Sequence, residues 1–535
     1  MIRLELDEAA APFEAELREL CKAFFPGEDF EIHTPEGVHF SERTGEESPL
    51  RLSLNVPGAS LSLGGSRKRD KSILKAWLYR KLSKECRREL PWGDLTGIRP
   101  VSLASRRLSR AERILARRLT ERELKELSEE LRSEYLLSEE KLRLMMEIAG
   151  RESRTLDRIW EKTGRSFREG FSLYVGIPFC PTRCLYCSFL SNPISLWEKR
   201  IGDYLDCLRR EIRAAMEEMS AQGKHLQTVY VGGGTPTALP ERWLSALMET
   251  LREECFCHPM TELCEFTVEA GRPDSLNREK LRILKDAGAD RISVNPQSFR
   301  QETLDLIGRR HTAEDVRSAF SMARDAGFSD INMDLIMGLP GEGLSEVTET
   351  LSETARLAPD SLTVHSLAVK RAARLREEKP LWDQVYRAGA DSTLYRESLS
   401  ERERNPLCSF PEGEGLSRKL CLMSEMERMM KAAEYTASLL GLRPYYLYRQ
   451  KNMAGNLENV GYAEPGKECL YNILMMEEKH TVIGCGAGSA TKRIFPDGRR
   501  ERCDNGKDIK YYFEKLPELI ERKRRLLRDE EAEGR

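Results

Sequence analysis

The sequence predicts an α/β protein built around a partial (β/α)6 TIM-like barrel, with an N-terminal α+β domain before it and a mainly helical C-terminal domain after it. From about Phe171, short β-branched runs alternate with amphipathic helical stretches. Polar or glycine-rich motifs follow nearly every run, at the strand ends where barrel enzymes place their chemistry. With 535 residues, the chain is long enough for roughly three domains.

Strands and helices are expected to alternate through the middle of the chain. The expected strands are Ser172–Pro178, Thr228–Gly232, Glu265–Ala270, Arg291–Pro296, Asp330–Met337 and Ser361–Ala368. The expected helices are Trp197–Met219, Pro240–Cys255, Arg278–Ala287, Thr312–Ala326 and Leu344–Leu357. Such alternation is typical of a parallel sheet covered by helices. We therefore expect domains over 1–165, 166–375 and 376–535.

Composition excludes several classes of protein. Hydrophobic residues make up 40% and charged residues 33%, and no run approaches the roughly 18 apolar residues that span a bilayer. The N-terminus is acidic and has neither a basic leader nor an apolar run, so we expect no secretory signal, no membrane partner and a cytoplasmic location. The 14 cysteines are then not expected to form a disulfide framework.

Basic residues are in excess between Arg67 and Arg118, where 17 Lys or Arg accompany five acids. The net charge of the whole chain is −2, so nucleic acid is not an expected partner. The next stretch, from Glu121 to Glu147, is acidic. We interpret the basic segment as solvated helix faces balanced by these acids, and keep a surface for an anionic partner as the alternative.

The strongest local signal is the loop GIPFCPTRCLYCSF, in which Cys180, Cys184 and Cys187 have C-x3-C-x2-C spacing after the first expected strand. Three thiolates from one loop can bind three irons of a [4Fe–4S] cube and leave the fourth iron open. A closed zinc site normally needs a fourth ligand, and residue 189 is Phe. Zinc is the alternative, and a redox-active cysteine pair is a weaker one.

The second signal is VYVGGGTPT, which contains Gly233, Gly234 and Thr235 at the end of the second expected strand. Consecutive glycines let a ligand approach the backbone closely, and we expect them to leave amides and carbonyls free to bind it. The spacing is not that of a dinucleotide fingerprint. Following the cysteine loop, this segment is a candidate for holding the ammonium and carboxylate of an amino acid.

Together, these motifs resemble those of the radical S-adenosylmethionine (SAM) enzymes, over about Phe171 to Val369. The cysteine loop and the upstream PWGDLTGIRP at Pro91–Pro100 resemble the HemZ-type coproporphyrinogen dehydrogenases of the oxygen-independent coproporphyrinogen oxidase-like group. The resemblance implies a [4Fe–4S] cluster on the three cysteines and SAM on its open iron. It further implies that an electron cleaves SAM and that the 5′-deoxyadenosyl radical removes hydrogen from substrate.

The resemblance also implies SAM-binding roles for residues at successive strand ends. Tyr174 is expected near SAM, the backbone of Tyr186 at the adenine, and Glu269 at a ribose hydroxyl. The other residues expected to bind SAM are Gly233, Gly234, Thr235, Gln297, Arg309 and Asp334. Each could instead be a capping or salt-bridged residue. His365, on the sixth strand, is either functional or a hydrogen-bonded core histidine.

The implied activity is oxidative decarboxylation of coproporphyrinogen III to protoporphyrinogen IX in haem biosynthesis, which would make the chain an oxidoreductase. Its partners would be a tetrapyrrole substrate, an electron donor of flavodoxin or ferredoxin type, and an unidentified electron acceptor. A basic N-terminal domain with Arg99 near the barrel mouth would suit a tetracarboxylate. Three alternatives stay open: a haem chaperone, an RNA-modifying radical SAM enzyme, and one that opens or alkylates haem.

Two features need separate interpretation. Phe189 stands where many members of the group have a further cysteine, which does not ligate the cluster in that family. The segment from Tyr471 to Arg493 resembles the family's C-terminal strand and turn, which helps to cover the barrel mouth. Its GCGAGSA run could be a nucleotide loop, but it lacks a βαβ context.

Overall fold

The computed structural model describes residues 2–25, 30–40, 52–56, 61, 63, 65–86, 89–97, 99–188, 192–368, 373–376, 425–450 and 457–528. The chain divides into two compact units. Unit 1 is 1–149, 383–428 and 448–458, and unit 2 is 150–382, 429–447 and 459–535. Helix α5 (Glu139–Thr163) begins in unit 1 and ends in unit 2. The three-domain division expected from the sequence stays a prediction.

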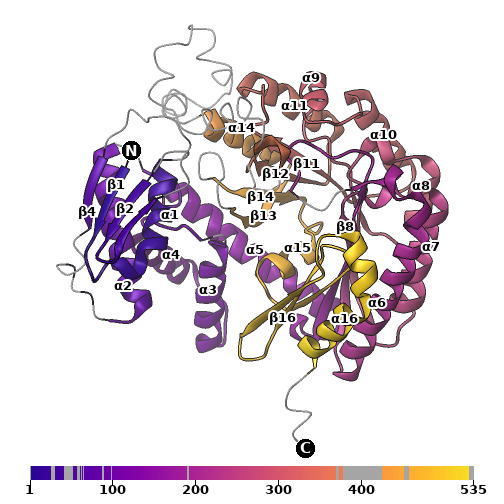
Figure 1. Ribbon diagram of the computed structural model, residues 1–535, viewed down its shortest axis with the longest axis horizontal. Helices are drawn as coiled ribbons and strands as arrows, with labels where there is room; N and C mark the ends of the chain where they lie inside the picture. The colour runs from indigo at the N-terminus through magenta and orange to yellow at the C-terminus, as the bar shows by residue number, and fades with distance from the viewer. Residues whose placement is uncertain are drawn as a thin grey trace, which may run out of the picture. The chain divides into compact units, whose positions relative to one another are not determined.

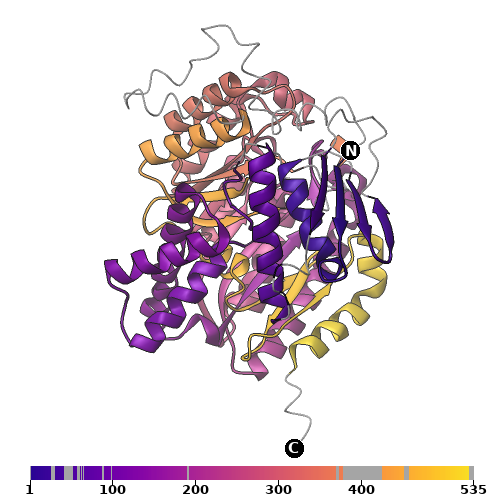
Figure 2. The same ribbon diagram turned by 90° about the vertical axis from the view of Figure 1, so that its left-hand side faces the viewer.

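The described strands of unit 1 form a mixed sheet in the order β3-β2-β1-β4. Figure 2 shows these strands in indigo. Their bounds are β1 Ile2–Leu6, β2 Phe30–Thr34, β3 Gly37–Phe40 and β4 Leu52–Val56. Leu4, Leu17 and Leu78 are fully buried where this sheet packs with α1 (Glu14–Phe24) and α2 (Arg67–Cys86). The N-terminal region is therefore of the α+β class predicted for it.

The basic segment of unit 1 is partly neutralised by ion pairs with the acids that follow it. On α3 (Val101–Leu115), Arg107 pairs with Glu134 of α4 (Glu121–Tyr135). Beyond α3, Arg117 lies 2.8 Å from Glu123. Exposed pairs of this kind contribute little to stability. They do support the interpretation of this segment as balanced helix faces.

The PWGDLTG turn is held by buried polar contacts within unit 1. Trp92 is 0% exposed, and its indole Nε1 donates to Glu458 Oε2 at 2.6 Å. Lys141 Nζ lies 2.5 Å from the other oxygen of the same carboxylate. Arg449 stacks over the Trp92 ring at 5.7 Å. These contacts explain the motif as a structural turn, and the placement of Arg99 near the barrel mouth stays a prediction.

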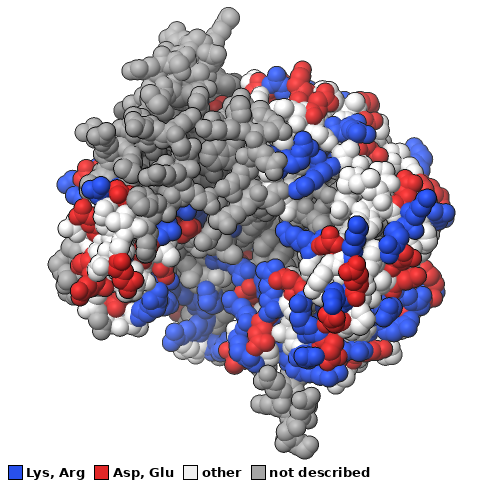
Figure 3. All heavy atoms as spheres, viewed as in Figure 1, with Lys and Arg blue, Asp and Glu red and all other residues white. Residues whose placement is uncertain are grey.

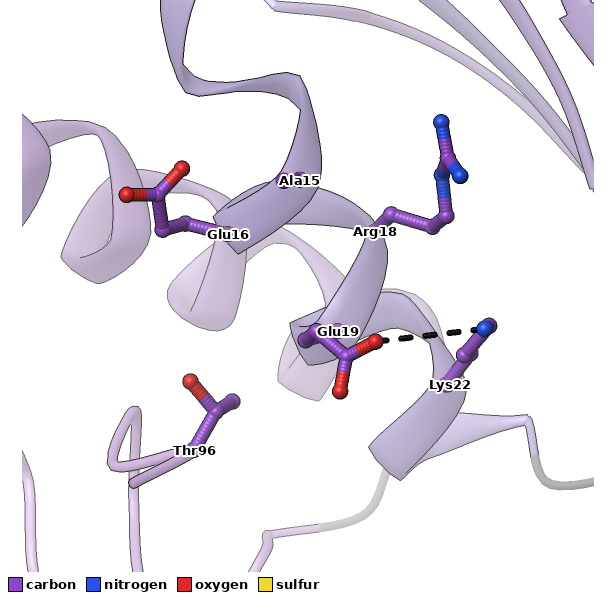
Figure 4. A pocket seen from close by; sticks show the side chains of 6 residues that line it. All are labelled: Ala15, Glu16, Arg18, Glu19, Lys22 and Thr96. Carbon is purple, nitrogen blue, oxygen red and sulfur yellow. Dashed lines mark ion pairs between the residues drawn. The ribbon is translucent and has the colours of Figure 1, made fainter. Parts of the chain in front are cut away.

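A shallow pocket in unit 1 lies along one face of α1 (Figure 4). Its lining residues are Ala15, Glu16, Arg18, Glu19, Lys22 and Thr96. Glu19 and Lys22 form an ion pair at 3.9 Å beside it. The lining is a charged helix face and contains none of the site residues expected from the sequence.

Unit 2 is built on a sheet whose central strands are parallel and neighbour one another in chain order. These strands are β5 (Gly170–Ile177), β8 (His225–Gly233), β9 (Thr261–Glu269), β10 (Arg291–Ser293), β11 (Ile331–Met337) and β12 (Ser361–Ser366). Beside the end of β5, the short strands β6 (Phe179–Cys180) and β7 (Asn192–Pro193) pair with each other. All six strands expected from the sequence are confirmed.

The connecting helices follow one another around the outside of these strands, as Figure 1 shows. They are α6 (Ile201–Ala221), α7 (Glu241–Leu251), α8 (Arg278–Asp286), α9 (Gln301–Leu306), α10 (Ala313–Asp325) and α11 (Leu344–Leu357). A capping box between Thr312 and Asp315 sets the start of α10. Right-handed βα units of this kind bring every strand's carboxyl end to one rim.

The C-terminal segment extends the sheet at both edges. β14 (Asn459–Ala463) pairs antiparallel with β12, with β13 (Arg443–Tyr448) beyond it. At the other edge, β15 (Thr481–Cys485) pairs parallel with β5 and leads into β16 (Ala490–Ile494) and β17 (Arg500–Asp504). The helices of this segment are α14 (Glu425–Leu439), α15 (Leu470–Met476) and α16 (Ile509–Leu527). The C-terminal segment, which was predicted to be mainly helical, therefore also contributes strands to the barrel sheet.

A buried ionic network fastens α16 to α6. Glu211 is 0% exposed and accepts hydrogen bonds from Lys523 Nζ at 2.5 Å and Tyr512 Oη at 2.7 Å. Asn505 Nδ2 and the amide of Gly486 also donate to this carboxylate, at 2.6 and 2.7 Å. These donors satisfy the buried carboxylate, which is therefore not left without hydrogen-bond partners in the interior.

The same contacts settle the role of the GCGAGSA run. The amide of Gly486 serves Glu211, the amide of Ala487 donates to Tyr204 Oη at 3.0 Å, and that of Gly488 donates to the carbonyl of Gly506 at 2.7 Å. β15 and β16 form an antiparallel pair here, without the helix of a βαβ unit. The run is a structural turn whose donors are already occupied, so the nucleotide-loop alternative is not supported.

The outer helices of unit 2 carry both signs of charge. In Figure 3, acidic and basic side chains are interspersed over these helices, on the right of the view. Arg282 of α8, for example, pairs with both Glu279 and Asp286. Among the helices that the structure describes, none has the length and apolar character needed to cross a membrane.

Candidate functional site

The cysteine loop follows β5 at the carboxyl-end rim of the barrel. Cys180 and Cys184 are each 8% exposed, and Cys187 is half-buried. Thr182 Oγ1 donates to the carbonyl of Gly308 at 2.8 Å, which ties the loop to the segment after α9. The loop thus presents three thiols from a short, anchored stretch of chain. Phe189, just beyond it, lies outside the described residues.

The three thiols influence one another electrostatically. Burial raises the pKa of Cys180 to about 12, and the nearby Cys187 and Cys184 contribute to the rise. Among the described residues, no group of three or more His, Cys, Asp or Glu side chains could hold a single metal ion. A [4Fe–4S] cube bonds each thiolate to a different iron, so its ligands need not converge on one atom.

Two buried guanidinium groups flank Cys184. Arg272 Nη1 lies 3.6 Å from Cys184 Sγ, and the Arg272 residue is 3% exposed. Arg309 is 6% exposed, and its Nη2 donates to Tyr186 Oη at 3.3 Å. Buried cations stabilise anionic groups beside them. The donor set therefore fits a negatively charged iron–sulfur cluster held by the thiolates.

The glycine loop after β8 packs against the start of the cysteine loop. The amide of Gly234 donates to the carbonyl of Ile177 at 2.7 Å, and that of Thr235 to the carbonyl of Phe179 at 2.7 Å. A Cβ at Gly234 would lie 2.5 Å from the Phe179 oxygen, which explains the need for glycine. The expectation that the loop leaves its amides free is wrong for these two residues, because the anchoring of the cysteine loop uses them.

Glu269 ends β9, whereas Asp334 lies in the middle of β11, and the two acidic side chains interact electrostatically. Glu269 accepts a hydrogen bond from Tyr230 Oη at 2.7 Å, and burial raises its pKa to about 7 with a further contribution from Asp334. Burial also opposes ionisation of Asp334, but the nearby His365 and a hydrogen bond from Asn332 Nδ2 at 2.7 Å hold its pKa below the usual range. His365 Nε2 lies 3.9 Å from Asp334 Oδ2, so this histidine faces an acid and is not packed only among apolar groups.

The raised pKa of Glu269 predicts a pH-dependent difference in stability. Between pH 4.5 and 7, the native carboxyl keeps its proton while the unfolded one loses it, so this residue lowers the free energy of unfolding as pH rises. Glu269→Gln removes that penalty. At pH 8 the variant should exceed wild type by up to about 3 kcal/mol, and at pH 4 by much less. Urea unfolding at both pH values measures it, and an equal difference at both would refute the ionisation argument.

Gln297 combines backbone strain with an unpaired polar atom. Its φ is +68°, in the left-handed region that costs a non-glycine residue on the order of 1 kcal/mol. Backbone bonds to β11 hold it there, since its amide donates to the Asp334 carbonyl at 3.0 Å and its carbonyl accepts from Ile336 at 3.1 Å. Gln297 Oε1 and Arg309 Nε are buried without a hydrogen-bond partner. An unpaired buried polar atom calls for an explanation, and a bound polar ligand is one.

Three stacked tyrosines were not expected from the sequence as a group. The ring centroids of Tyr174 and Tyr230 are 6.2 Å apart, and those of Tyr230 and Tyr471 are 4.5 Å apart. Buried Glu265 positions Tyr471 by accepting the amides of Leu470 and Tyr471 at 2.6 and 3.2 Å. Tyr174 and Tyr230 pair in register, a signal visible in SLYVGIP and VYVGGGT, whereas no local signal points to Tyr471.

Arg272 and His311 were also not expected as site residues from the sequence. Each stands two or three residues from an expected site residue, in EAGRPD after Glu269 and in GRRHT after Arg309. His311 is 0% exposed, and neither ring nitrogen has a hydrogen-bond partner. Its Nδ1 lies 4.0 Å from Asp274 Oδ1. Their positions beside the motif residues were the available signal.

The chain has relatives among known proteins. Residues 174–354 match the Radical SAM superfamily. The chain is 37% identical to the oxygen-independent coproporphyrinogen-III oxidase-like protein HemZ of Bacillus subtilis, over 81% of this chain and 76% of that protein. It is 38% identical to the heme chaperone HemW of Bacillus subtilis, over 37% of this chain and 51% of that protein. A solved structure of coproporphyrinogen III oxidase (HemN) from Escherichia coli aligns with a TM-score of 0.46 at 21% identity, covering 69% of this chain and 73% of that one.

Proposed function

Because the chain belongs to the oxygen-independent coproporphyrinogen-III oxidase-like family of radical SAM proteins, we propose that it converts coproporphyrinogen III to protoporphyrinogen IX by oxidative decarboxylation. The family implies a [4Fe–4S] cluster and SAM as cofactors. The observation that carries the proposal is the loop with buried Cys180 and Cys184 and half-buried Cys187 after β5, together with the unpaired buried atoms Gln297 Oε1 and Arg309 Nε. Similarity to HemZ covers most of both chains and supports the choice of reaction.

The three cysteines would hold the cluster, and when bound, the cluster and SAM supply a carbon radical that removes hydrogen from substrate. The residues of the chain bind and orient SAM. Glu269, at the end of β9, would accept from the ribose hydroxyls, and Gln297 Oε1 with Arg309 Nε would bind polar groups of SAM. Tyr174 and the Tyr186 backbone would contact SAM from the cysteine-loop side. The stacked tyrosines fill space beside Glu269 and exclude water from it.

Substitution of Arg309 should weaken SAM binding without loss of iron. Arg309→Ala removes a buried donor with one unpaired nitrogen, and loss of a charge-assisted hydrogen bond costs about 1–3 kcal/mol, or roughly 5- to 150-fold in affinity. Glu269→Ala and Asp334→Ala should likewise weaken SAM binding without loss of iron. The exposed neighbour Arg310 provides a matched control, since Arg310→Ala should bind SAM normally.

SAM affinity is measured by equilibrium dialysis and iron by colorimetric assay on the same preparations. If iron falls together with SAM affinity in Arg309→Ala, the residue supports the loop rather than the ligand. Unchanged SAM affinity in all three variants would remove these residues from the proposed binding site.

A haem chaperone is the second candidate, favoured by the similarity of part of the chain to HemW. The two functions differ in what drives SAM cleavage. The proposed enzyme should form 5′-deoxyadenosine under anaerobic conditions with a one-electron reductant only when coproporphyrinogen III is present. A protein that binds haem with high affinity and cleaves no SAM in the presence of coproporphyrinogen would be assigned to the chaperones instead. We also propose a physiological electron donor of flavodoxin or ferredoxin type and an electron acceptor that is not identified.

A further inference from the structure

We propose that Arg272 is a positioning residue for the iron–sulfur cluster, whose guanidinium donates a hydrogen bond to the Cys184 thiolate and raises the reduction potential of the cluster. The inference rests on the cluster assignment of the proposed function. Arg272 lies just after β9, in the AGRPD segment, and the resemblance to the family assigned it no role.

The Arg272 side chain is fixed on three sides. Its Nε donates to Asp274 Oδ1 at 2.9 Å and its Nη2 to Asp274 Oδ2 at 2.7 Å, a bidentate pair. Nη2 also donates to Thr182 Oγ1 at 3.1 Å, within the cysteine loop. This leaves Nη1 directed at Cys184 Sγ, 3.6 Å away, which is within range for a hydrogen bond to sulfur. A planar fork held in this way points one donor at one sulfur.

Charge decides the direction of the effect. Reduction adds one electron from an external donor to an already anionic assembly of thiolates and cluster, and no bond or proton needs to move. A nearby cation stabilises the reduced form more than the oxidised form, and hydrogen bonds to ligand sulfur act in the same direction. The potential therefore rises, which makes reduction easier for a weak donor.

The counterion only partly cancels this cation. The Asp274 side chain is 18% exposed, whereas that of Arg272 is 3% exposed, so water screens the carboxylate better than the guanidinium. The carboxylate also sits on the far side of the fork from Nη1. A net positive potential remains at the sulfur.

The test is an anaerobic redox titration of the reconstituted full-length protein without SAM, followed by electron paramagnetic resonance, with iron measured on each sample. Arg272→Met keeps a long buried side chain but removes every donor. At a fixed ambient potential, its ratio of reduced to oxidised cluster should fall about tenfold, equivalent to about 59 mV for a one-electron couple. Arg282→Met, which removes an exposed arginine of α8 paired with acids, is the matched control and should leave the ratio unchanged.

Asp274→Asn is a second variant with the opposite expected sign. It leaves Arg272 in place without its counterion, so the reduced fraction should increase. Normal iron with an unshifted ratio in Arg272→Met would overturn the inference and leave the proposed function intact. If Arg272→Met binds no iron, an unshifted ratio in Asp274→Asn overturns it. A wild-type protein that cannot be loaded with a cluster would overturn both the inference and the proposed function.

Discussion

Replacement of Cys184 by alanine is expected to abolish both cluster binding and SAM cleavage. A [4Fe–4S] cluster held by three thiolates has no spare protein ligand, so loss of one leaves an iron without its anchor. Cys184 is 8% exposed and lies between two buried arginines, where no other described cysteine of the loop can replace it. Cys180→Ala and Cys187→Ala should give the same result.

Iron content, the brown absorbance of the anaerobic protein and formation of 5′-deoxyadenosine measure this effect. Two other cysteines serve as controls, half-buried Cys207 on α6 and exposed Cys257. Cys207→Ala and Cys257→Ala should retain about four iron per chain, the content of one cube. A Cys184→Ala protein that keeps full iron and activity would contradict the assignment of the cysteine loop.

Glu211→Ala is expected to give the largest loss of stability of the substitutions considered. It leaves the Lys523 ammonium, 3% exposed, buried without its carboxylate, and it removes the acceptor of Tyr512, Asn505 and Gly486. Breaking one side of a buried pair costs about 3–5 kcal/mol. The free energy of unfolding, measured by urea denaturation, should fall by that amount.

Two further variants separate the buried charge from other causes. In Glu211→Leu with Lys523→Met, neither charge remains, and much of the lost stability should return. Glu217, on the same helix, pairs with Arg524 at the surface at 3.0 Å, so Glu217→Ala should have little effect. A Glu211→Ala protein as stable as Glu217→Ala would show that the network is unimportant.

The barrel could be predicted from local sequence because each strand and helix carries its own signal. β11 and α11 illustrate this, since the mostly apolar run Ile331–Met337, which is buried except at half-buried Asp334, and the apolar spacing of Leu344–Leu357 each predict one element. The order of the candidate site residues follows from the order of the predicted strands, because parallel strands present their carboxyl ends to one side. The three cysteines were predicted for the same reason: ligand spacing within one loop is a local property.

What could not be predicted depends on contacts between distant parts of the chain. Tyr471 reaches the rim only because Glu265, more than two hundred residues earlier, accepts the amides at the start of α15. Lys523 and Glu211, which are joined by a hydrogen bond, are likewise far apart in the sequence. The left-handed backbone of Gln297 has no local signature, since glutamine is not a residue that prefers this conformation. Occupied amides in the glycine loop likewise depend on the packing of the cysteine loop.

The reaction proposed for this chain is decarboxylation of coproporphyrinogen III with a cysteine-bound cluster and SAM. The most direct test is mass spectrometry of the tetrapyrrole after anaerobic incubation with reconstituted protein, SAM, a one-electron reductant and an added electron acceptor. Cys184→Ala protein, prepared in the same way, is the control. Each of two propionate side chains should lose carbon dioxide and two hydrogens to become a vinyl group, and only with wild-type protein. A tetrapyrrole of unchanged mass, recovered from cluster-loaded protein that cleaves SAM, would contradict the proposed reaction.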